Sequence, residues 1–112
     1  MVRYNNKYKT MDKKDMRNYV QNAVKSFLEG QIKETILSNI VLVFDPYDQF
    51  ENANIYVKKM WCGKPILLET FSLDNYYKNF WEMVSEPWTC DLVTDITNLV
   101  ELHYEEPKRM GW

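Results

Sequence analysis

The sequence predicts a single α+β domain built around an antiparallel β-hairpin at residues 54–72. Two patterns lead to this fold class. Apolar residues recur at helical spacing in 12–29 and 73–86, whereas 39–45 and 54–72 carry the apolar, β-branched and aromatic runs typical of strands. The length of 112 residues and the hydrophobic content of 46% suit one domain with its own core. We expect this domain to span 11–106, between a mobile basic arm at 1–10 and a tail at 107–112.

The first predicted element is a helix over about 12–29, with its apolar residues gathered on one side. The phase of this pattern changes at Gly30, because Ile32 and Ile36 would fall on the polar side if the helix continued. Glycine commonly ends helices. We therefore expect the helix to break near Gly30, with a short second helix over 31–38.

The next predicted element is a buried strand over 39–45. It contains five consecutive apolar residues and ends in the turn-forming pair Asp45 and Pro46. Together with the two strands of the hairpin, this segment completes a three-stranded antiparallel sheet.

The hairpin is the clearest local signal. Placing Gly63 and Lys64 as a two-residue type II′ loop puts glycine at the first central position, as that turn requires. The resulting register places Lys58 opposite Glu69, a favourable pair of opposite charges. It also makes both faces of the hairpin apolar, although a small sheet needs only one such face for its core. One predicted face consists of Tyr56, Met60, Leu67 and Phe71.

The C-terminal part is predicted to contain one or two helices. Ser72 is placed to cap a helix that runs from Leu73 to Glu86 and ends before Pro87. Residues 90–104 fit either a helix, through the spacing of their apolar residues, or a fourth strand, through the alternation at their end.

No pattern in the chain points to catalysis, to a cofactor or to a metal. His103 is the only histidine, and no serine lies in a nucleophile motif. Asp45, Asp48 and Glu51 recur at three-residue spacing, but the alternating acids and central glycine of a calcium loop are missing. We expect a protein that is not an enzyme and holds no cofactor or metal.

The chain is expected to be cytoplasmic and not associated with membranes. Its longest apolar run, Ile40–Phe44, is too short to cross a bilayer, and residues 1–19 do not resemble a secretory signal. Cys62 and Cys90 are accordingly predicted to be free thiols.

The function expected from these observations is protein binding. The second apolar face of the hairpin needs a cover, and the chain is rich in the Trp, Tyr and Met residues that are enriched in interfaces. An inhibitor, immunity or anti-defence protein of bacterial or phage origin would fit. The predicted partner-binding residues are Tyr56, Met60, Leu67, Phe71, Trp81 and Trp88.

Two alternatives remain open at this level. A nucleic-acid-binding protein could use the basic N-terminal region, although the whole chain has a net charge of −2. A homodimer or other homo-oligomer could bury the second apolar face against its own copy. The residues predicted for nucleic-acid contact are Arg3, Lys7, Lys9, Lys13, Lys14 and Arg17.

Overall fold

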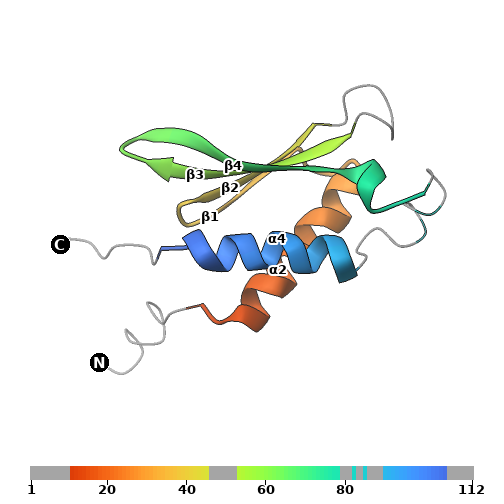
Figure 1. The fold of residues 1–112 in the computed structure, drawn as a ribbon, viewed down its shortest axis with the longest axis horizontal. Coiled ribbons are helices and arrows are strands. Elements are labelled where there is room, and N and C mark those ends of the chain that lie inside the picture. Colours follow the sequence, from red (N-terminus) through yellow and green to blue (C-terminus); the bar gives the residue numbers. More distant parts are fainter. Residues whose placement is uncertain (1–10, 46–52, 79–81, 83–84, 86–89, 106–112) are drawn as a thin grey trace.

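The computed structural model describes residues 11–45, 53–78, 82, 85 and 90–105, and shows a layer of strands packed on a layer of helices (Figure 1). The strands form one antiparallel sheet in the order β1-β2-β3-β4, with the helices on one of its faces. The α+β class is therefore confirmed, but the sheet has four strands instead of three. The elements are α2 (Lys13–Leu28), β1 (Glu34–Leu37), β2 (Ile40–Asp45), β3 (Asn54–Trp61), β4 (Lys64–Ser72), the 3-10 helix η2 (Leu73–Asn75) and α4 (Cys90–His103).

Helix α2 forms as its sequence predicts. The side chain of Asp12 caps it by accepting a hydrogen bond of 2.8 Å from the Asp15 N–H. The chain leaves the helix at Gly30, which has a φ of 75°, a conformation that glycine adopts without strain. The buried side of the helix carries Met16, Val20, Ala23, Val24 and Phe27.

The short helix expected over 31–38 is wrong, because Glu34–Leu37 is strand β1. β1 pairs with β2 across a two-residue turn at Ser38 and Asn39. The break at Gly30 was a valid signal. However, β1 has only four residues. Its alternation of exposed and half-buried side chains is too short to distinguish a strand from a helix by periodicity.

The core lies between the helices and the inner face of the sheet, meaning the face on which α2 and α4 pack. The rings of Phe27 in α2 and Phe44 in β2 stack there, with their centroids 5.4 Å apart. Residues 90–103 form a helix and not a fourth strand, because four of their apolar residues are buried on one side. These residues are Leu92, Val93, Ile96 and Val100.

The hairpin over 54–72 is present, but its predicted turn and register are wrong. The turn residues are Cys62 and Gly63, with φ values of 53° and 80°, so both central positions have the positive φ of a type I′ turn. Trp61 therefore pairs with Lys64. The favourable pair predicted between Lys58 and Glu69 does not form, since Lys58 lies opposite Leu67.

A β-bulge at Leu68 separates the two halves of the hairpin. Val57 pairs with Glu69 while Lys58 pairs with Leu67, which leaves Leu68 as the extra residue on β4. The bulge reverses the alternation of side chains along β4. Consequently Phe71 pairs with Ile55 and is buried on the inner face, instead of sharing the face of Leu67.

The helix expected from Leu73 to Glu86 begins only as the 3-10 helix η2, and residues 76–78 are not helical. Ser72 precedes η2, but its hydroxyl donates to the Asp74 carboxylate instead of capping a backbone N–H. Of the remaining predicted segment, Glu82 and Ser85 are helical, and the other residues after Lys78 lie outside the described residues.

Candidate interaction surface

Exposed apolar side chains concentrate at the end of the β3–β4 hairpin, in a segment that we call the hairpin tip (residues 59–68). Among the described residues, six large apolar side chains are exposed, and four of them belong to this tip. The other two are Ile36 on β1 and Leu102 on α4. The four tip residues and their exposed fractions are Met60 (37%), Trp61 (53%), Ile66 (45%) and Leu67 (54%).

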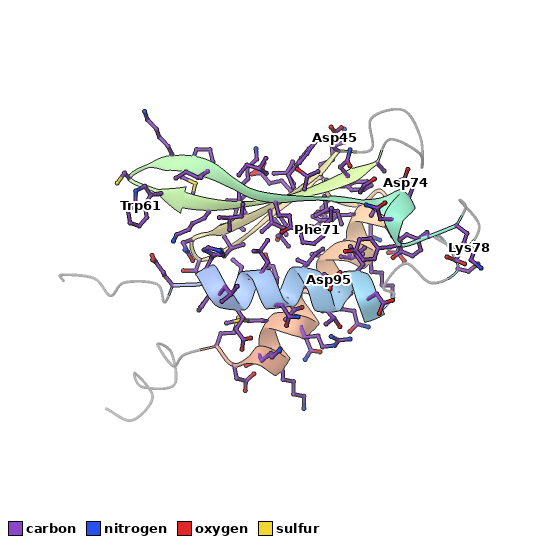
Figure 2. The ribbon with its side chains drawn as sticks, in the orientation of Figure 1. Asp45, Trp61, Phe71, Asp74, Lys78 and Asp95 are labelled. Atoms are coloured by element: carbon purple, nitrogen blue, oxygen red, sulfur yellow. The ribbon has the colours of Figure 1, made fainter. Side chains whose placement is uncertain are left out.

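The hairpin tip is apolar on both of its faces. Met60 and Leu67 lie on the outer face of the sheet, which is the face turned away from the helices. Along β3, Met60 alternates with residues that face the core, and Leu67 pairs with an outer-facing residue of β3. Trp61 and Ile66 lie on the inner side. Figure 2 shows Trp61 at the free end of the hairpin, on the side of the sheet where α4 lies.

The inner side of the tip forms a groove with the C-terminal end of α4, which we call the tip groove. Its volume is about 270 Å³. The ammonium of Lys59 lies 5.1 Å from the centroid of the Trp61 ring, close enough for a cation–π interaction. The tip groove is lined by Lys59, Trp61, Ile66, Leu68 and His103.

The end of α4 is held in place by the turn between β1 and β2. The side chain of Asn39 donates a hydrogen bond of 2.9 Å to the carbonyl of His103 and accepts one of 2.8 Å from the N–H of Glu105. The Ser38 hydroxyl donates to the Glu105 carbonyl at 2.6 Å. These bonds satisfy backbone groups at the helix terminus and fix the position of His103 beneath the hairpin.

The bulge contributes directly to the tip groove. Leu68, the extra residue, is half-buried, packs against the core and lines the groove. β4 is an edge strand of the sheet, and both the bulge and Pro65 make it a poor template for another strand.

The outer face is partly polar at the end away from the tip. The hydroxyl of Tyr56 donates a hydrogen bond of 3.1 Å to the carboxylate of Asp45. This bond, with smaller effects of burial and charge, raises the pKa of Tyr56. Asp48 and Glu51, which follow Asp45 in the acidic pattern, lie outside the described residues. Within the described ranges, no three His, Cys, Asp or Glu side chains come together as a metal site would require.

The structure brings together only part of the predicted partner surface. Tyr56, Met60 and Leu67 share the outer face, whereas Phe71 is buried beneath the sheet. Trp81 and Trp88 lie outside the described residues. Sequence reasoning missed Trp61 and Ile66, because it assigned their face to the core. The unused signal was the Cys62-Gly63 pair, whose type I′ turn would have given the observed register near the tip.

The described residues of the basic region, Lys13, Lys14 and Arg17, all belong to α2. Lys13 forms an exposed ion pair with Glu101 at 3.6 Å, and Arg17 donates a hydrogen bond of 2.8 Å to the Thr94 hydroxyl. Lys14 is exposed. Two of the described basic residues thus contact α4. Arg3, Lys7 and Lys9 lie outside the described residues.

A second groove, of about 180 Å³, lies between α2 and β1. The hydroxyl of Tyr19 lines it and is already bonded to the Thr35 hydroxyl and, at 2.8 Å, to the Ile36 carbonyl. The polar atom that Tyr19 contributes to this groove is therefore already bonded within the chain.

Comparisons with protein-family models, with curated proteins and with solved structures found no match. No helix in the described ranges is both long and apolar enough to cross a membrane.

Proposed function

We propose that this chain is a protein-binding module whose contact surface is the hairpin tip. The observation that carries the proposal is the concentration of four exposed apolar side chains in one short segment. Single exposed apolar residues are normal on protein surfaces and need no explanation. A group of them at one end of a hairpin, here two on each face, is instead typical of an interaction site.

The residue types at the tip support this proposal. Tryptophan and methionine are enriched in interfaces, and tryptophan is common among the residues that contribute most binding energy. The tip exposes one of each, Trp61 and Met60, beside Ile66 and Leu67. An inhibitor, an immunity protein or an anti-defence protein would use such a surface in the same physical way.

The size of the tip groove also favours a protein partner over a small molecule. Pockets for small molecules usually measure about 300–1,000 Å³ and enclose most of the ligand. The tip groove, at about 270 Å³, lies below that range. It suits one side chain of a partner, while the remaining contact area would come from the outer face of the tip.

The test compares two aspartate substitutions on the outer face. Leu67→Asp changes the hairpin tip. Ile36→Asp makes the matching change on β1, which lies three strands away across the sheet, roughly 14 Å at the usual strand spacing. Both side chains are exposed, so each variant is expected to fold with a loss of about 1 kcal/mol or less.

Each variant is immobilised and offered an extract of the native host, and captured proteins are quantified against the unsubstituted chain. We expect a stoichiometric partner that Leu67→Asp loses and Ile36→Asp keeps. Equal capture by Leu67→Asp and the unsubstituted chain would contradict the proposal. Light scattering could also contradict it, by showing that the free chain is a dimer and that Leu67→Asp converts it to a monomer. The hairpin tip would then be a surface for self-association.

A further inference from the structure

The hairpin tip carries a charge opposite in sign to that of the whole chain. Residues 59–68 contain two lysines and no acidic residue, although the chain has 16 acidic residues and a net charge of −2. Both lysines lie on the groove side. In the observed register Lys59 is opposite Ile66, and Lys64 is opposite Trp61. The apolar surface of the tip groove is thus framed by two positive charges on one side of the hairpin.

We propose that the tip groove receives one apolar side chain from an acidic segment of the partner, whose carboxylates lie against Lys59 and Lys64. This inference rests on the proposed function and adds the chemistry of the partner to it. The apolar anchor would pack on Trp61, Ile66 and Leu68, while the flanking acids would meet the lysines at the rim.

The existing geometry of Lys59 supports this arrangement. Its ammonium lies 5.1 Å from the centroid of the Trp61 ring. A charge that is already held beside the groove needs less ordering when an acidic group arrives. Charges at the rim of an interface mainly steer association and select partners, so they favour acidic segments over neutral or basic ones.

The shape of the site favours a peptide segment over an anionic membrane. Lysines beside exposed Trp, Ile and Leu residues would also suit a lipid surface. A groove with Leu68 and His103 among its lining residues, however, is complementary to a protruding side chain. Binding of the tip to an anionic membrane would contradict the inference.

The experiment selects ligands from a library of short random peptides displayed on phage, using the immobilised full chain in reducing buffer. One synthetic peptide from the selection then serves as the probe in fluorescence polarisation. We expect the selected sequences to be enriched in Asp and Glu around a Leu, Phe or Trp. We also expect their affinity to fall as salt is raised.

Two neighbouring lysines supply the matched control. Lys59→Glu changes the groove side and should weaken binding of the probe by about tenfold or more. Lys58→Glu makes the same charge change on the outer face of the same strand, where Lys58 is opposite Leu67, and should weaken it by less than about threefold. Ile66→Ser should also weaken binding, because the residue lines the tip groove.

Three outcomes would overturn the inference. The selected peptides could lack acidic enrichment. Alternatively, Leu67→Asp could abolish peptide binding while Lys59→Glu leaves it unchanged, which would locate binding on the outer face. The chain could also sediment with vesicles of phosphatidylserine and phosphatidylcholine in a manner that Lys59→Glu abolishes. The first two outcomes leave the proposed protein-binding function intact, because that function is tested separately with the host partner.

Discussion

The turn of the β3–β4 hairpin provides the sharpest stability prediction. Cys62 occupies the first central position of a type I′ turn with a φ of 53°. Left-handed backbone costs most residues roughly 1–2 kcal/mol, whereas asparagine tolerates it best among residues with a side chain. Cys62→Asn should therefore stabilise the protein by about 0.5 kcal/mol or more, while Cys62→Val, which is β-branched, should destabilise it by about 1 kcal/mol or more.

Gly63 extends the same series at the second central position. A Cβ added at this residue would meet no atom within 4 Å, so the cost of Gly63→Ala comes from the backbone alone. With a φ of 80° we expect a loss of about 1–2 kcal/mol. The expected order of stability is Cys62→Asn, then the unsubstituted chain, then Cys62→Val and Gly63→Ala.

The free energies of unfolding are measured by urea titration followed by circular dichroism, with reductant present because the Cys62 side chain is exposed. A change of 1 kcal/mol moves the urea midpoint by roughly 0.3–1 M if the slope is unchanged. If the turn were Gly63-Lys64, Cys62 would be a strand residue, and valine would then be more stable than asparagine. That reversed order would refute the observed register.

Three further variants test other parts of the structure by the same titration. Thr97→Val should stabilise the protein by about 1 kcal/mol, because the buried Thr97 hydroxyl has no hydrogen-bond partner among the described residues. A loss of stability would instead show that this hydroxyl has a hydrogen-bond partner. Asn39→Ala should cost about 1–2 kcal/mol through its two bonds to the end of α4, and an unchanged midpoint would show that those bonds contribute nothing. Burial and a 2.6 Å hydrogen bond to Asp95 raise the pKa of Tyr76. The contribution of Tyr76 to the free energy of unfolding is therefore complete below pH 10.0, the pKa of the unfolded side chain, and is lost as the pH rises above that value. Tyr76→Phe should therefore flatten the fall in stability above pH 10, and identical slopes would contradict that assignment.

Most of the secondary structure could be predicted from sequence periodicity. The helix over about 12–29, the strand over 39–45, the two strands of the hairpin and the helical alternative for 90–104 all correspond to observed elements. Each is long enough, or apolar enough, for its spacing to be decisive. β1 was missed because four residues do not define a period, and its pairing depends on the neighbouring strand β2.

The candidate site was harder to predict because it depends on contacts distant in sequence. The bulge at Leu68 has no clear local signal, yet it moves Phe71 into the core and Leu68 toward the groove. The tip groove also forms only because the end of α4 lies beneath the hairpin. A hydrogen bond from Asn39, a residue distant in sequence, holds the end of α4 there. The sequence did predict that the hairpin would be apolar on both faces, which is the property that defines the hairpin tip.

Hydrogen exchange shows directly whether the hairpin tip is the surface that binds a protein partner. Amide exchange is followed by mass spectrometry for the free chain and for its complex with the captured host partner. We expect the main protection on binding in residues 59–68, together with the C-terminal end of α4 near His103. Protection confined to α2, or to the β1 edge around Ile36, with residues 59–68 unchanged, would contradict it.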